Sequence, residues 1–441
     1  MKDRGFLALA LSGLALFGCT ASQVSSNDGL ASPDVPNNWP VYASETVPDA
    51  FSAQGIDALE QRMARFVSDG DTKGITTLLL HDGQVVSHMQ AGIRKDADGA
   101  PLTEDTIFRI YSMSKPITAV ALLMLYEDGA FALDDPVTKF IPEFENLQQY
   151  VADGEAQPVA RSPTMAEVMS HTAGFAYGLS DATPPDAQMR AARVLNQPDM
   201  QSFVDVVAGI PLLKAPGEDW YYSVSSDIKG VLVERISGQS FETFLETKVF
   251  EPLGMDDTGF TVPEDDYDRF SDVWSWRPAT QSYVPNPYPW AMFLESTVGM
   301  RSGGGGLVST LDDYARFTQM LLNEGALGDV RILEPATVAL LTTNVLRQDQ
   351  SIFTDGTMGP AIGGMGFGLG VGTVDGPPAT DRGYGPGTHY WGGAAGTWYW
   401  IDPENDLIFI GMIQRFRPGA PPVNFRAISA QLVYDAMVGD E

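Results

Sequence analysis

The sequence predicts an α+β fold in which both ends of the chain contribute to one antiparallel sheet. Two stretches, "TTLLLHDGQVVSHMQAG" from Thr76 and "GTWYWIDPENDLIFIGMIQRF" from Gly396, each hold two apolar runs around a turn. Apolar runs that flank Asp-Gly or a Pro-Glu-Asn-Asp turn are typical of β-hairpins. The middle of the chain is patterned mostly as helices broken by loops rich in Pro and Gly, so we expect a mostly helical insertion between the hairpins.

Amphipathic helices accompany both hairpins. The first helix is indicated by apolar residues at helical spacing, which are Ile56, Leu59, Met63, Phe66 and Val67. The segment "NFRAISAQLVYDAMV", from Asn424, predicts the last helix, and another is expected from near Ser112 to Asp128, ending at Gly129. These helices are expected to flank the sheet. The glycine-rich stretch from Gly356 to Gly387 predicts long loops around one short strand, 367–374.

The beginning of the chain predicts export. Residues 1–19 start with Lys and Arg, continue with a mostly apolar run of about a dozen residues, and end at Cys19, the only cysteine. A membrane span needs about 20 apolar residues, so this run fits a signal peptide instead. The segment "LFGC" resembles the lipobox of bacterial lipoproteins, in which the cysteine is acylated. An ordinary secretory signal is the alternative.

The predicted organisation follows from these boundaries. Residues 20–48, which contain Ser, Asn and Pro, are predicted to form a tether. Residues 49–441 are predicted to form one domain, with its sheet part at about 49–111 and 300–441 and its helical part at about 112–299. We expect the protein at the periplasmic face of a bacterial cell envelope, anchored to the membrane through lipid on Cys19, and otherwise periplasmic or secreted.

Composition excludes several functions. The net charge is −30, from 57 Asp and Glu against 27 Lys and Arg, and such a surface repels nucleic-acid phosphates. No nucleic-acid partner is therefore expected. The four histidines show no metal-binding spacing, so we expect no metal and no other cofactor. No intact G-x-S-x-G is present either, which argues against an α/β-hydrolase nucleophile.

The stretch "YSMSKPIT", Tyr111 to Thr118, contains a Ser-x-x-Lys pattern at Ser112 and Lys115. On a helix, these two side chains would project from one face. A backbone N–H at the helix start lies unsatisfied at the positive end of the dipole, where it can stabilise an oxyanion. The pattern alone is too short to decide, because Ser226 and Lys229 repeat it at the start of another helical run.

Longer segments decide between the two copies. "PGEDWYYSVSSDIKG" (216–230) and "HYWGGAAGTWYW" (389–400) follow the first motif in order, and "DDPVTKFIPEF", "MSHTAGF", "EPLGMDDTGF" and "GGGGLVSTLDDYARF" agree with them. With these segments the chain resembles the serine β-lactamase-like, penicillin-recognising hydrolases, from about Gly55 to Val438. It is most similar to the family VIII carboxylesterases, relatives of class C β-lactamases. The resemblance implies a β-lactamase/transpeptidase-like fold.

The resemblance also implies roles for the first two motifs. Ser112 would be the nucleophile, Lys115 its partner and Tyr222 the catalytic tyrosine. The second Ser-x-x-Lys copy, Ser226 and Lys229, falls inside the W-x-Y-S-x-x-x-D-x-x-G element by coincidence. Its neighbour Asp227 could pair with Lys229 or cap the helix. A serine needs a base to take its proton, and a lysine cation nearby favours the phenolate of a tyrosine.

The third motif implies how substrate is held. Trp391, Gly392 and Gly393 stand where a lactamase carries Lys-Thr-Gly on its edge strand, and they would bind substrate. The backbone N–H of Ala394 would complete an oxyanion hole with that of Ser112. The missing lysine, and Val224 in place of a lactamase asparagine, favour uncharged esters over β-lactams. The aromatic segment 273–293 could line an apolar pocket, although ordinary loop packing explains it nearly as well.

Two other polar residues are expected to be structural. His171 is predicted to hydrogen-bond nearby backbone rather than to act as a base, and Ser114 is predicted to serve packing. We therefore predict a serine hydrolase that cleaves short-chain carboxylic esters through an acyl-Ser112 intermediate. The first alternative is a β-lactamase, DD-peptidase or D-amino-acid peptidase, with a β-lactam or peptide as the small-molecule substrate. The second is a non-catalytic envelope protein that binds peptidoglycan or a partner.

Overall fold

The computed structural model describes most of the globular part of the chain. The described residues are 39, 47–151, 155–179, 181, 183–286, 299–347, 352–353, 365–376, 383–416 and 423–438. The predicted signal peptide, Cys19 and most of the predicted tether lie outside them. Within these ranges, every helix is too short or too polar to cross a membrane.

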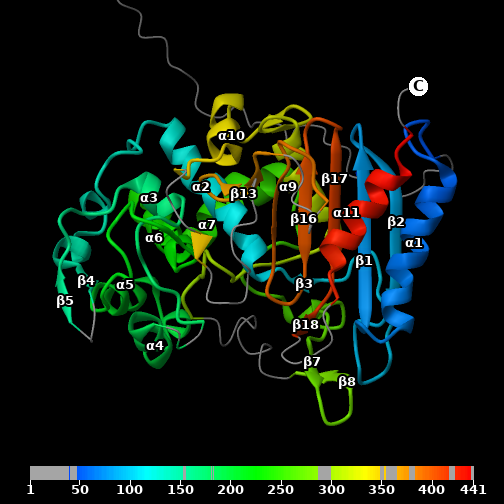
Figure 1. The fold of residues 1–441 in the computed structure, drawn as a ribbon, viewed down its shortest axis with the longest axis horizontal. Coiled ribbons are helices and arrows are strands. Elements are labelled where there is room, and N and C mark those ends of the chain that lie inside the picture. The colour runs from blue at the N-terminus through cyan, green and yellow to red at the C-terminus, as the bar shows by residue number, and fades with distance from the viewer. Residues whose placement is uncertain are drawn as a thin grey trace, which may run out of the picture.

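A seven-stranded sheet forms one half of the molecule (Figure 1). Its order is β13-β14-β15-β16-β17-β1-β2, and each neighbouring pair is antiparallel. β1 pairs with β17, with Thr76 opposite Met412, so the predicted sheet built from both ends of the chain is confirmed. The strands are β1 Gly74–His81, β2 Gln84–Gly92, β13 Met365–Phe367, β14 Gly372–Val374, β15 His389–Gly392, β16 Trp398–Asp402 and β17 Leu407–Met412.

The two predicted hairpins are present, and the glycine-rich region differs from prediction. Asp82 and Gly83 join β1 to β2 with φ of 49° and 67°, as a tight hairpin turn requires. The single strand predicted at 367–374 is wrong, because two short strands, β13 and β14, pair there as a hairpin. The reversal packs closely on its surroundings: a Cβ on Gly368 would collide with the carbonyl oxygen of Leu341.

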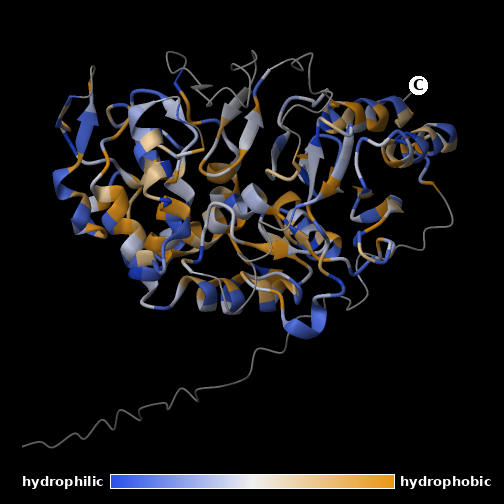
Figure 2. Ribbon diagram, turned by 90° about the horizontal axis from the view of Figure 1, so that it is seen from below, coloured by the Kyte–Doolittle hydropathy of each residue, from blue (hydrophilic) through white to orange (hydrophobic). Residues whose placement is uncertain are grey.

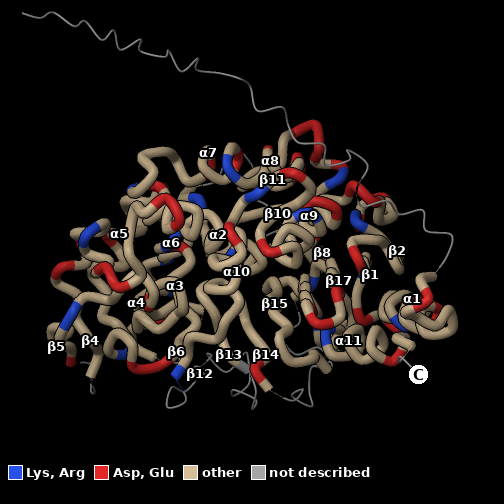
Figure 3. Tube along the Cα trace, turned by 90° about the horizontal axis from the view of Figure 1, so that it is seen from above, with Lys and Arg blue, Asp and Glu red and all other residues tan. Residues whose placement is uncertain are grey.

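Helices cover both faces of the sheet (Figures 1 and 3). α1 (Ala53–Ser68) and α11 (Phe425–Ala436) lie side by side on one face, while α2 (Ser114–Glu127) and α9 (Leu311–Leu322) pack on the other. Successive strand side chains point to opposite faces, so Leu79 joins the α1/α11 core and Leu78 the α2/α9 core. Burial on both faces explains why these strands are apolar runs rather than alternating patterns.

The other half of the molecule is mostly helical, and apolar residues concentrate in the interior of both halves (Figure 2). Its helices are α3 Met165–Met169, α4 Pro184–Ala191, α5 Met200–Ala208, α6 Ser225–Ser237, α7 Phe241–Leu245 and α8 Glu251–Leu253. A further helix, α10 (Pro335–Thr342), packs beside α2. Small strand pairs complete the fold: β3 Phe108–Arg109 with β9 Val308–Ser309, β4 Gln148–Tyr150 with β5 Ala156–Pro158, β6 Trp220–Tyr221 with β12 Ile352–Phe353, β10 Ala326–Leu327 with β11 Val330–Arg331, and β7 Trp274–Arg277 with β8 Ser282–Pro285 and β18 Arg415–Phe416.

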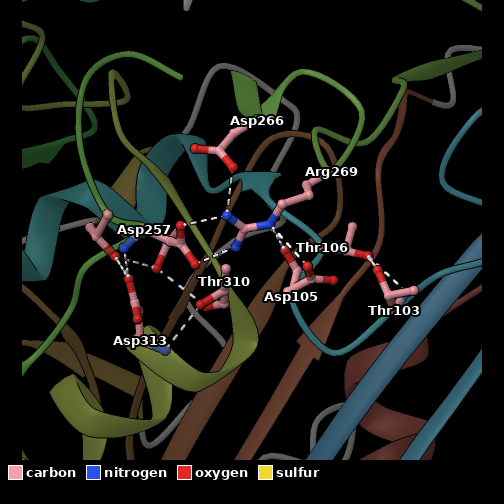
Figure 4. Close-up of polar contacts among 10 residues, drawn as sticks. Thr103, Asp105, Thr106, Asp257, Asp266, Arg269, Thr310 and Asp313 are labelled. Carbon is pink, nitrogen blue, oxygen red and sulfur yellow. Dashed lines mark hydrogen bonds and ion pairs between the residues drawn. The ribbon is translucent and has the colours of Figure 1, made fainter. Parts of the chain in front are cut away.

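An arginine surrounded by carboxylates ties several loops together (Figure 4). Nη1 of Arg269 lies 2.9 Å from both Asp257 Oδ1 and Asp266 Oδ1, and Nε lies 3.1 Å from Asp105 Oδ2. The backbone N–H of Asp257 donates in turn to Asp313 in the first turn of α9. The Thr310 hydroxyl caps this helix, because it accepts from the N–H of Asp313. The cluster therefore fixes the loop before β3 to the start of α9.

Candidate active site

Ser112 lies in a single 3₁₀ turn, Tyr111–Met113, that leads into α2. The helix predicted from Ser112 thus begins with a tighter turn, closed by the N–H of Met113 donating to the carbonyl of Ile110 at 3.0 Å. Tyr111 has φ of 44°, a conformation that is unusual for a bulky residue and tends to occur at functional sites. No hydrogen bond from the N–H of Ser112 to another described residue is present.

Lys115 is fully buried in the first turn of α2, and its Nζ has three hydrogen-bond acceptors. These are Oγ of Ser112 at 3.2 Å, the hydroxyl of Tyr177 at 3.0 Å and the carbonyl of Gly304 at 2.6 Å. An ammonium group has three protons to donate, so these acceptors hold it in one position. The i, i+3 relationship of Ser112 and Lys115 brings the two side chains together as the sequence predicts.

Tyr222 contacts the same serine. It lies between β6 and α6, and its hydroxyl donates to Ser112 Oγ at 2.7 Å. Nζ of Lys115 lies 4.6 Å from the centre of the Tyr222 ring. The three residues assigned from the resemblance therefore form one cluster of hydroxyl, ammonium and phenol.

Tyr177 is a further member of this cluster that the sequence did not indicate. Its ring stands edge-on to that of Tyr222, with the centroids 5.1 Å apart. Burial, and then the nearby Tyr222 and Asp227, raise the pKa of Tyr177 well above its ordinary value, so it remains a neutral phenol. Tyr177 follows "MSHTAGF" by two residues, but nothing in that spacing shows that its side chain points toward Lys115.

Asp227 holds the backbone that receives Lys115. Its Oδ1 accepts from the N–H of Gly304 at 3.1 Å and from the Ser302 hydroxyl, and the carbonyl of the same Gly304 accepts from Lys115. The predicted partners of Asp227 are therefore wrong: it fixes segment 302–304 instead of pairing with Lys229 or capping α6. Burial raises the pKa of this carboxyl, although the Lys115 charge opposes the increase.

The second Ser-x-x-Lys copy does not present a nucleophile. Ser226 and Lys229 lie in α6 and are fully buried. The Ser226 hydroxyl lies 3.5 Å from Nε2 of His171, and no hydrogen bond to Lys229 is present among the described residues. A serine without exposed surface cannot meet a substrate in this conformation.

His171 is structural, as the sequence predicts. Its Nδ1 accepts from the backbone N–H of Ser223 at 3.2 Å, and its ring packs against Tyr222 and Phe367. Burial lowers the pKa of His171 well below 6.5, and the charges of Lys229 and Lys115 act in the same direction. The imidazole is therefore neutral. Ser114 also has the expected packing role, because its buried hydroxyl accepts from the N–H of Leu307.

The third motif lies at the end of β15, close to the serine. The Trp391 ring is buried, and its centroid lies 5.7 Å from that of Tyr222. Neither Gly392 nor Gly393 has room for a Cβ, which at Gly393 would collide with the carbonyl of Ile110, two residues before Ser112. The N–H of Gly393 donates to Thr397 at 2.8 Å and closes a tight turn.

Ala394 is exposed at the tip of this turn. Its N–H makes no hydrogen bond to another described residue, as for Ser112. The turn that carries this amide packs on the backbone just before Ser112, because a Cβ on Gly393 would collide with the carbonyl of Ile110. Such amides are suitable donors for the oxyanion of an acyl-transfer intermediate.

The remaining substrate-related predictions have a mixed outcome. Val224 is buried at the start of α6 and its N–H donates to Ala176, so its side chain is part of the core. In the aromatic segment 273–293, Trp274 is buried and Trp276 packs on Tyr283. Residues 287–298 lie outside the described residues, so the predicted apolar pocket remains a prediction.

The chain is similar to several known proteins. The sequence model of the family described as Beta-lactamase matches residues 57–432. Protein Rv1367c of Mycobacterium tuberculosis is 33% identical over 369 residues, covering 81% of this chain and 90% of its own. Esterase EstB of Burkholderia gladioli is 30% identical over 389 residues, covering 82% and 91%. The solved structure of EstCE1, described as a hydrolase with promiscuous acyltransferase activity, superposes with a TM-score of 0.70 at 24% identity and covers 88% of this chain and 99% of its own.

Proposed function

The chain belongs to the Beta-lactamase family and is a serine hydrolase of that family, and we propose that it is a carboxylesterase acting through an acyl-Ser112 intermediate. The observation that carries this proposal is the position of Ser112 Oγ, 2.7 Å from the Tyr222 hydroxyl and 3.2 Å from Lys115 Nζ. A serine becomes nucleophilic when a neighbouring group takes its proton. In this cluster Tyr222, with Lys115 beside it, is the group in position to do so.

The proposed reaction has two halves. The proton of Ser112 passes to the Tyr222–Lys115 pair while Oγ attacks the ester carbonyl, and the oxyanion is held by the amides of Ser112 and Ala394. When the carbon–oxygen bond of the ester breaks, the pair returns its proton to the leaving alkoxide. Water then attacks acyl-Ser112 with help from the same pair, and this step releases the acid and restores the hydroxyl.

Uncharged short-chain esters are the proposed substrates. The resemblance aligns Trp391, whose indole is buried, with a lysine of the lactamases, which implies that a cation for a substrate carboxylate is missing at this position. Val224 packs in the core and offers no amide to an acyl-amide side chain. The name of the 30% identical relative, Esterase EstB, supports an ester substrate.

One assay tests the proposal. The purified protein, Ser112→Ala and Ser226→Ala are each incubated with p-nitrophenyl acetate, p-nitrophenyl butyrate and a chromogenic cephalosporin. Ester turnover that is lost in Ser112→Ala and retained in Ser226→Ala is expected. Faster turnover of the cephalosporin would favour a β-lactamase instead, and the absence of both turnover and an acyl-enzyme mass would favour a binding protein.

For the N-terminus, we propose export and lipid attachment at Cys19, which would place the hydrolase at the periplasmic face of the cell envelope. The support is sequence alone: the charged start, the short apolar run and the terminal "LFGC". Expression in a bacterium with labelled palmitate tests it. Label and membrane association should both be lost in Cys19→Ser, whereas an unlabelled, freely released wild type would indicate an ordinary signal peptide.

A further inference from the structure

Lys229 is a buried lysine without a hydrogen-bond partner in the part of the chain that the structure describes. It lies in α6 with no exposed surface, and its Nζ contacts no acceptor there. Removing an ammonium group from water without giving it a partner is costly. The position of Lys229 relative to the Ser112 cluster therefore needs an explanation.

The Lys229 side chain extends toward the face of α2 that carries Lys115. A Cβ added to Gly370 would lie 3.8 Å from Nζ of Lys229, and it would also collide with the Cβ of Ala119. Ala119 follows Lys115 by one helical turn, so the two share a face of α2. Nζ of Lys229 consequently lies between α6, α2 and the turn that joins β13 to β14.

Among the described residues, three ionisable groups interact electrostatically with Lys229: Lys115 of α2, Asp227 of α6 itself and His171 of the segment after α3. Turn 368–371 and α10 carry no ionisable side chain. Burial, followed by repulsion from Lys115, lowers the pKa of Lys229 to about 7, and Asp227 offsets only part of this. Lys229 therefore changes its charge near neutral pH, next to the Ser112 cluster.

We propose that Lys229 is a positioning residue of the Ser112 site, which supplies a second cation next to the Lys115–Tyr222 pair. The proposal rests on the proposed function. A positive charge on Lys229 disfavours a proton on Lys115. This effect favours the form of the Lys115–Tyr222 pair that accepts the Ser112 proton. Lys229 thereby extends activity toward acid pH, and its influence ends where it becomes neutral.

The Lys229→Met variant tests this role, because methionine keeps an unbranched apolar stem without the charge. The second-order rate constant kcat/KM for p-nitrophenyl butyrate is measured from pH 5 to pH 10. The acid limb of the profile should shift to higher pH by about one unit, so that kcat/KM at pH 6 falls roughly tenfold. The alkaline plateau should stay unchanged. Lys139→Met, which removes an exposed cation, serves as the control and should leave the limb in place.

Unfolding experiments give a second readout. The pKa of Lys229 falls from 10.5 to about 7 on folding. The buried lysine therefore destabilises the folded state fully below pH 7, and this effect is absent above pH 10.5. Lys229→Met should therefore be more stable than wild type at pH 7, and this difference should shrink by pH 10.

An unchanged acid limb of the activity profile, or an equal loss of activity at every pH, overturns the role of Lys229 while ester turnover by wild type stands. A wild type without ester turnover overturns both proposals.

Discussion

The hydroxyl of Tyr222 lies 2.7 Å from Oγ of Ser112, although 110 residues separate them in the chain. A second tyrosine, Tyr177, also contacts Lys115, with its hydroxyl 3.0 Å from Nζ. The environments of the two differ, because Tyr177 is buried and its raised pKa keeps it protonated. In the proposed mechanism, Tyr222 therefore transfers the proton and Tyr177 supports Lys115.

Replacing each tyrosine with phenylalanine should separate these roles. Tyr222→Phe removes the group that contacts Ser112, so kcat for p-nitrophenyl butyrate should fall by about 10²–10⁴. Tyr177→Phe removes one of three acceptors of Lys115 and should reduce kcat by about tenfold, because a single hydrogen bond to a charged group is lost. Equal losses in the two variants, or a larger loss in Tyr177→Phe, would contradict the assignment.

The turn at Gly393 gives a second prediction. A Cβ at this residue would collide with the carbonyl of Ile110 and with Oγ1 of Thr397, so Gly393→Ala should displace the turn that carries Ala394. Loss of one oxyanion donor costs about 10²–10³ in kcat. Gly209→Ala is the matched control, since its Cβ would have only ordinary contacts, the nearest at 3.6 Å. Wild-type kcat in Gly393→Ala would show that this turn does not serve the reaction.

Local sequence patterns were sufficient to predict much of the fold. The contacts between distant segments could not be predicted from them. The β1–β2 turn at Asp82-Gly83 is set by a few neighbouring residues, and the hairpin was predicted from them. The pairing of Asp227 with Gly304 joins segments 77 residues apart, so no periodicity could reveal it. The β13–β14 hairpin was missed because glycine-rich sequence carries little strand signal, although glycine fits the close approach to Leu341.

Arg269 should be important for stability rather than for catalysis. It is the shared partner of Asp105, Asp257 and Asp266, and its side chain is only 20% exposed. Arg269→Met would leave three carboxylates facing one another, so the free energy of unfolding should fall by about 2–3 kcal/mol. Denaturant titration measures this, and Lys139→Met, at an exposed pair, should cost below about 0.5 kcal/mol. Equal effects would show that the cluster is no stronger than a surface ion pair.

Asp313 predicts a dependence of stability on pH. Burial raises its pKa from 3.8 to about 7, against the opposing hydrogen bond from Thr258. A carboxyl whose pKa is raised by folding contributes stability that is fully present below pH 3.8 and is lost as the pH rises through 7. Asp313→Asn keeps an oxygen that can accept from the Thr258 hydroxyl and from the N–H of Asp257, but it cannot ionise. The variant should therefore match wild type near pH 4 and exceed it at pH 8.

Chemical unfolding at pH 4, 6 and 8 tests the sign as well as the size of this effect. The advantage of Asp313→Asn should reach about 2–4 kcal/mol at pH 8, because each pKa unit corresponds to about 1.4 kcal/mol. Glu143→Gln is a control of opposite sign, since hydrogen bonding to Arg235 lowers the pKa of Glu143 to about 2. That pair stabilises the fold above pH 4.5 and is lost as the pH falls through 2, so Glu143→Gln should be weaker than wild type at pH 8. If Asp313→Asn were also weaker than wild type at pH 8, the carboxylate of Asp313 would be a stabilising partner of Thr258 and Asp257 rather than a buried charge that opposes folding.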